Sequence, residues 1–164
     1  MVMSNLDQLS TNEVLALERT AAKQGTGLQA PALIGRWSPR RLWSAGAPEP
    51  NTGQAKLLQL LRAELKIAEA DPHAVADLEL SNAVGVGPFS LRFTGPGWLQ
   101  GRRPLLLFHF EHLSLSLGRL QLLHVNLPAP KPKRSPFFAL IGCSDDGWLL
   151  ARGRGGGLAL WQRD

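Results

Sequence analysis

The stretches Phe89-Ser-Leu-Arg-Phe93 and Leu113-Ser-Leu-Ser-Leu117 decide the fold, because apolar and polar residues alternate in both of them. A period of two is typical of β-strands that turn one face inward. Similar short segments recur from Leu78 to Trp161, separated by turns rich in glycine and proline. No regular alternation of strands with helices interrupts this series. The sequence therefore predicts a mainly β chain of about eight or nine antiparallel strands, closed into a barrel that leaves no exposed edge.

The alternation changes parity within residues 105–117. Apolar side chains occupy even positions up to Phe110 and odd positions from Leu113 onward. A parity switch inside a strand needs an extra residue, so we expect a bulge or a break at Glu111-His112. With that irregularity, both apolar sets would face one interior.

A helix is predicted ahead of the strands. Ser10 and Glu13 have the spacing of a capping box, and Gly25 is a natural helix end. We assign residues 1–30 to an N-terminal helical segment and residues 31–164 to the barrel domain.

Residues 54–69 fit two structures. Leu57, Leu58 and Leu61 form a helical face, whereas Leu65 and Ile67 alternate with polar neighbours as in a strand. We predict a short helix at 54–61 and a strand at 63–69, with the position of the join left open.

Composition and length limit the class of protein. The chain has 164 residues, of which 44% are hydrophobic, so it can bury a core and is not disordered. Its one cysteine, Cys143, excludes an internal disulfide and a cysteine-rich zinc site. The longest apolar run, Leu105–Phe108, is far shorter than the ~18 residues of a membrane span, and the first residues lack the features of a signal peptide. We therefore expect a soluble, cytoplasmic protein.

The net charge of +5 comes from residues 101–164, which hold nine Lys/Arg and four Asp/Glu, whereas the rest of the chain is balanced. Lys131, Lys133 and Arg134 share a proline-rich loop and are the candidate surface-binding residues. Such a loop suits peripheral contact with an anionic membrane surface; the alternative is a solvated loop without a partner. We expect no nucleic-acid partner, since the glycine-rich run 152–157 is too short and leads directly into a strand.

The sequence offers little material for catalysis or metal binding. His109, Glu111 and His112 lie close together, but on a strand only the first two share a face, and two ligands are too few for zinc. Solvent-facing polar residues on a half-buried strand are the alternative. Cys143 lacks a local histidine that would activate its thiol. We predict no catalytic residue, no metal and no cofactor.

Trp37, near the first strand, and Arg152, near the last, are predicted to close the barrel. A guanidinium stacked on the indole face would contribute roughly 0.5–2 kcal/mol. An interior of about eight strands can hold one small ligand; a filled core is the alternative. The residues predicted to line the interior and to bind such a ligand are Phe89, Leu91, Phe93, Phe108, Phe110 and Leu115.

Several segments resemble known families. Leu33-Ile-Gly-Arg-Trp37 is similar to the Gly-x-Trp opening of lipocalin-like (calycin) barrels. Leu91-Arg-Phe-Thr-Gly-Pro-Gly97, the segment Phe108–Gly118 and the run Trp148–Gly156 resemble the plastid lipid-associated protein or fibrillin (plastoglobulin-like) family.

This resemblance implies a lipocalin-like antiparallel barrel without enzymatic activity, from a cyanobacterial cell. It also implies association with thylakoid or lipid-globule surfaces and binding of a small apolar molecule, which would be a lipid, an isoprenoid or a pigment. Two other functions stay open. One is a bilin-lyase-like calycin that handles a phycobiliprotein chromophore, with Arg92 and Glu111 at the barrel mouth, and the other is a protein-interaction module with a filled core.

Overall fold

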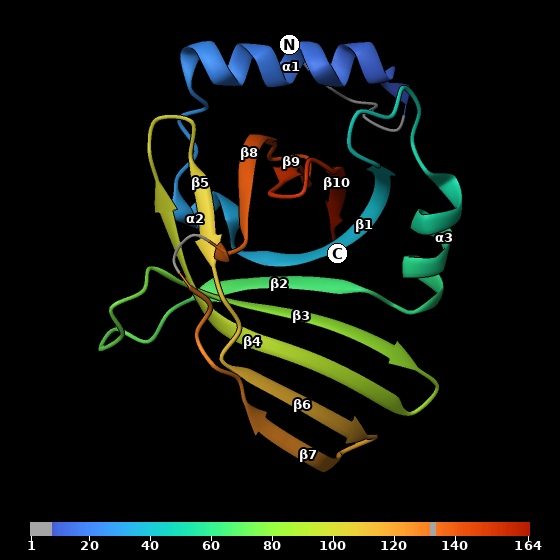
Figure 1. Ribbon diagram of the computed structural model, residues 1–164, viewed down its shortest axis with the longest axis vertical. Coiled ribbons are helices and arrows are strands. Elements are labelled where there is room, and N and C mark those ends of the chain that lie inside the picture. The colour runs from blue at the N-terminus through green and yellow to red at the C-terminus, as the bar shows by residue number, and fades with distance from the viewer. Residues whose placement is uncertain (1–7, 132–133) are drawn as a thin grey trace.

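Eight antiparallel strands close into a barrel in the computed structural model, which describes residues 8–131 and 134–164 (Figure 1). Around the barrel the strand order is β3-β2-β1-β10-β9-β8-β5-β4, and pairing of β3 with β4 completes the circle. The barrel strands are β1 (Gly35–Trp43), β2 (Glu64–Glu69), β3 (Leu78–Val86), β4 (Phe89–Gln100), β5 (Leu105–Phe108), β8 (Phe137–Cys143), β9 (Trp148–Gly153) and β10 (Leu158–Arg163). The predicted mainly β antiparallel barrel is confirmed.

A hairpin of two further strands stands outside this circle. β6 (His112–Leu117) pairs with the first half of β4, whereas β5 pairs with the second half, and β7 (Leu120–Asn126) pairs only with β6. The hairpin thereby continues the β3–β4 sheet past the barrel, at the opposite end of the molecule from helix α1 (Thr11–Gln24; Figure 1). We call residues 82–93 and 112–126 the extension.

The predicted break at Glu111-His112 is present, but its consequence differs from the prediction. The Glu111 amide donates to the Thr94 carbonyl at 2.8 Å, and a Cβ atom at Gly95 would overlap the His109 carbonyl oxygen. Glycine therefore lets the chain cross close to β4 before β6 begins. Because β6 belongs to the extension, its leucines do not share the barrel interior with Phe108. The expectation that both apolar sets face one interior is therefore wrong.

Three helices accompany the strands in the described part of the chain. The predicted capping box begins α1: the Ser10 amide donates to Glu13 Oε2 at 2.7 Å, and the Glu13 amide donates to Ser10 Oγ at 3.2 Å. α2 (Ala30–Leu33) leads into β1, and α3 (Thr52–Leu60) followed by β2 confirms the predicted helix and strand within 54–69. None of these helices has the length and apolar character needed to cross a membrane.

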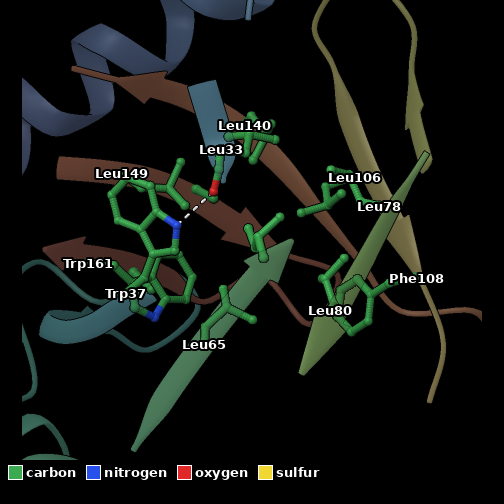
Figure 2. Packing of buried hydrophobic residues seen from close by; sticks show 13 residues of the cluster. Leu33, Trp37, Leu65, Leu78, Leu80, Leu106, Phe108, Leu140, Leu149 and Trp161 are labelled. Carbon is green, nitrogen blue, oxygen red and sulfur yellow. Dashed lines mark hydrogen bonds between the residues drawn. The ribbon is translucent and has the colours of Figure 1, made fainter. Parts of the chain in front are cut away.

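Side chains of the protein itself occupy the barrel interior (Figure 2). Trp37 is fully buried, and its Nε1 donates to the Leu33 carbonyl at 2.9 Å. The buried cluster consists of Leu33, Trp37, Leu65, Ile67, Leu78, Leu80, Leu106, Phe108, Leu140, Leu149, Ala151, Ala159 and Trp161.

A second buried cluster lies on the outside of the barrel, beneath α1. Val14 and Ala21 of the helix pack with Ile141, Leu150 and Leu160 of the sheet. β9 and β10 therefore bury apolar side chains on both faces, which is why neither strand alternates strictly.

Candidate functional site

One side of the extension is built almost wholly from apolar side chains. Residues directly opposite each other in an antiparallel sheet point to the same side. Phe89 lies opposite Val86 and Leu117, and Leu91 lies opposite Val84 and Leu115. We call this surface the apolar face; its residues are Val84, Val86, Phe89, Leu91, Phe93, Leu113, Leu115, Leu117, Leu120, Leu123 and Val125.

Much of the apolar face is open to solvent. The exposed fraction is 63% for Val86, 49% for Phe89, 61% for Leu120 and 49% for Leu123. Isolated exposed hydrophobic side chains are ordinary, but a contiguous exposed apolar patch marks an interaction site. The apolar face is therefore the candidate functional site.

A bulge in β7 adds one more apolar side chain to the hairpin. Leu115 lies opposite Leu123 and Ser116 opposite Gln121, so Leu122 is the extra residue between them. Its side chain is 48% exposed. The bulge interrupts the ladder of β6 and β7 and increases the local twist.

The reverse side of the extension is polar. Arg92, Ser114 and His124 lie opposite one another across three strands. His112 Nδ1 lies 3.0 Å from Asn126 Oδ1, and the His112 and His124 rings stack with centroids 5.3 Å apart. The extension is thus an amphipathic sheet, of which one side suits water and the other does not.

A row of aromatic rings joins the apolar face to the barrel core. The ring centroids of Phe93 and Phe110 are 5.6 Å apart, and those of Phe110 and Phe108 are 5.5 Å apart. Phe138 continues the row at 5.2 Å from Phe108, and Trp161 lies 5.3 Å further on. Such spacings are favourable for aromatic pairs, so the base of the apolar face is anchored on the core.

The six residues predicted to line the barrel interior divide between two places. Phe108 lies in the core and Phe110 packs at its edge. Phe89, Leu91, Phe93 and Leu115 belong to the apolar face, outside the barrel, so their predicted interior position is wrong. The physical reason is that eight strands close the barrel without β6. Sequence reasoning did not assign a role to Val86, Leu120 and Leu123, although the absence of acidic residues from 112–126 was a visible signal.

The predicted contact between Trp37 and Arg152 is also wrong. Arg163 lies directly opposite Trp37 in the β1–β10 pair, and its Cζ is 4.5 Å from the Trp37 ring centroid. Arg152 is on the outer side of β9, where its Nη2 donates to Glu18 Oε1 of α1 at 2.7 Å. A guanidinium therefore stacks on the Trp37 indole as expected, but it belongs to Arg163 and not to Arg152.

The ion pair between Glu18 and Arg152 predicts a pH-dependent stability. The hydrogen bond from Arg152 holds the pKa of Glu18 below its ordinary value of 4.5, so the pair stabilises the fold above that pH and its contribution is lost as the carboxylate is protonated. Glu18→Gln should lower the free energy of unfolding by about 1–2 kcal/mol at neutral pH. Urea denaturation should show this difference shrinking below pH 4.5. Glu49→Gln, at an exposed position, is the matched control, and an undiminished Glu18→Gln effect in acid would contradict the assignment.

The predicted surface-binding loop follows β7. Lys131 and Arg134 are exposed, and the Arg134 amide donates to the Lys131 carbonyl at 2.8 Å; Lys133 lies outside the described residues.

His109 Nε2 lies 3.2 Å from Glu111 Oε1. Among residues 8–131 and 134–164, no group of three or more His, Cys, Asp and Glu side chains could hold a metal ion.

Comparison of the chain with protein-family models, with curated proteins and with solved structures finds no match. The resemblance to the fibrillin family therefore stays a prediction.

Proposed function

We propose that this protein is a non-enzymatic lipid-associated protein that attaches to an anionic lipid surface through the apolar face of the extension. The observation that carries the proposal is the exposure of Val86, Phe89, Leu120 and Leu123 on one side of a single sheet. Transfer of such side chains into an apolar environment is favourable, at about 25 cal/mol for each Å² removed from water.

The charges around the apolar face favour an anionic surface. Residues 81–94 and 112–126 contain no aspartate or glutamate. Arg92 belongs to the reverse side of the sheet, so the cations near the apolar face are those at the turns. Arg119 lies at the β6–β7 turn, and Arg62 donates from Nη2 to the carbonyl of Gly87 at the β3–β4 turn, at 2.7 Å. Each cation near an anionic membrane contributes about 1 kcal/mol.

The two turns lie side by side, which concentrates these charges at one tip. The Gly118 amide donates to the Pro88 carbonyl at 2.8 Å. A tip that combines arginines with Val86, Phe89 and Leu120 suits the boundary between headgroups and acyl chains. Two copies of this surface would instead bring like charges together, which disfavours a second copy as the occupant.

The resemblance to fibrillins extends the proposal to thylakoid or lipid-globule surfaces. It also includes a small apolar ligand, a lipid, an isoprenoid or a pigment. Because core side chains occupy the barrel, such a molecule would lie against the apolar face, where Phe93 and Phe110 offer aromatic contacts.

Co-sedimentation with vesicles tests the proposal. The protein should bind phosphatidylcholine vesicles that contain phosphatidylglycerol more tightly than pure phosphatidylcholine, and salt should weaken this binding. The double variant Leu120→Glu with Leu123→Glu should bind at least about tenfold more weakly, because it loses apolar contact and adds negative charge.

The matched control is Leu57→Glu with Val75→Glu, since both side chains are exposed apolar residues outside the extension, one on α3 and the other in the loop between β2 and β3. It introduces the same charges and should bind vesicles like the wild-type protein. No vesicle binding by the wild type, or an equal loss in both double variants, would overturn the proposal. A dimer that only the first double variant abolishes would assign the apolar face to a second copy.

A further inference from the structure

A hollow of about 220 Å³ lies on the outer side of the sheet where β1, β2, β3 and β4 run next to one another. Arg36 lies opposite Lys66, Lys66 opposite Ser81, and Ser81 opposite Thr94, so these four side chains form a row across the four strands. The hollow is lined by Arg36, Lys66, Ala68, Glu79, Ser81, Arg92 and Thr94.

Three cations converge on this row. Arg92 Nη1 donates to Ser81 Oγ at 2.9 Å. Because Ser81 lies opposite Lys66, this hydrogen bond brings the Arg92 guanidinium near Lys66. Arg36 and Lys66 are a directly opposed pair, and like charges in that arrangement destabilise a sheet. In the described part of the chain no carboxylate forms an ion pair with any of the three.

We propose that this hollow binds the phosphate group of a small phosphorylated compound. Three cations and the single carboxylate of Glu79 leave two positive charges in excess, which matches the charge of a phosphate monoester near pH 7. Guanidinium groups donate paired hydrogen bonds that fit phosphate oxygens, and an ammonium group adds a point charge.

The two hydroxyl groups complete the set of donors. Ser81 is only 5% exposed, and because its oxygen accepts from Arg92, its hydrogen is available for an anion in the hollow. Thr94 is its direct neighbour on β4. A bound phosphate would thus separate Arg36 from Lys66 and use both hydroxyls.

The hollow lies on the opposite side of the sheet from the apolar face, so the source of the phosphate is a freely diffusing compound and not a lipid headgroup. Side chains alternate along β4, so Arg92 and Thr94 point away from the side that carries Leu91 and Phe93. A lipid surface against the apolar face would meet the opposite side of the sheet from the hollow. The site therefore acts independently of lipid attachment.

Titration with inorganic phosphate and pyrophosphate at constant ionic strength tests the site. Amide chemical shifts should change in a saturable way at Ser81 and Thr94, and chloride at the same ionic strength should not cause this change. Arg36→Gln and Lys66→Gln should each weaken phosphate binding about tenfold, since each removes a charge-assisted contact. Glu79→Gln should strengthen binding, a direction that structural damage would not produce.

Lys23→Gln is the matched control, because Lys23 is an exposed cation on α1 and its loss lowers the net charge equally. The absence of saturable binding, or equal weakening by Lys23→Gln and Lys66→Gln, would overturn the proposal.

A second arm uses phosphatidylcholine vesicles that contain phosphatidic acid. Lys66→Gln should leave vesicle binding unchanged; a loss as large as that of the Leu120→Glu, Leu123→Glu variant would show that the phosphate is a lipid headgroup and overturn the assignment to a diffusing compound.

Discussion

A variant that lacks residues 112–126 should fold as the closed barrel and bind lipid vesicles much more weakly than the wild-type protein. The barrel circle does not include β6 or β7, and β3 stays paired with β4 along its whole length. The Leu127 amide donates to the Glu111 carbonyl at 2.7 Å, so the two ends of the excised segment are already adjacent. Two glycines can therefore join Glu111 to Leu127. The excision removes six of the residues of the apolar face, together with Arg119.

Circular dichroism and vesicle co-sedimentation measure the two halves of this prediction. The thermal midpoint should stay within a few degrees of the wild-type value, because the deleted strands contribute only partly buried or exposed side chains. Vesicle binding as tight as that of the wild type by a folded variant would contradict the proposed site. If the excised chain does not fold, the barrel depends on the hairpin, and the Leu120→Glu, Leu123→Glu variant then tests lipid binding in the intact chain.

Replacement of Trp37 by alanine should cost about 3–5 kcal/mol in the free energy of unfolding. The side chain is fully buried and donates a hydrogen bond to the Leu33 carbonyl (Figure 2). It also lies beneath the Arg163 guanidinium. The substitution leaves a cavity at the centre of the core and an unpaired buried carbonyl. Urea denaturation measures the loss.

Trp98→Ala is the matched control for the Trp37 variant. Trp98 is partly exposed on β4, and its ring contacts the His109 ring in a tilted arrangement, with centroids 5.6 Å apart. Its removal should cost clearly less. Equal losses for the two substitutions would contradict a central role for Trp37 in the core.

Alternation in the sequence predicted the strands and the barrel, but not where each apolar side chain would lie. Phe89 and Leu91 alternate with polar residues just as Leu78 and Leu80 do, yet the first pair is on the extension and the second is in the core. A period of two says that the faces of a strand differ; it does not say whether another strand covers the apolar one. That depends on the crossing at Gly95, a tertiary contact that local sequence does not encode.

The partner of Trp37 was mispredicted for a related reason. In β10, Arg163 has the same parity as the inward-facing Ala159 and Trp161. Arg152 has instead the parity of Leu150, which faces α1. Because α1 covers the outside of these strands, apolar residues occupy both the odd and the even positions. The sequence alone therefore does not show which set of side chains faces the barrel interior.

The bulge at Leu122 also affects how β7 behaves at the end of the sheet. In the described chain β7 pairs only with β6, so its outer row of backbone N–H and C=O groups is a template on which a strand of another molecule could grow. Fibril formation needs a long, regular ladder that repeats from chain to chain. The extra residue bends the strand and breaks that regularity. The bulge therefore disfavours the addition of further strands at this edge, although the apolar face beside it is exposed.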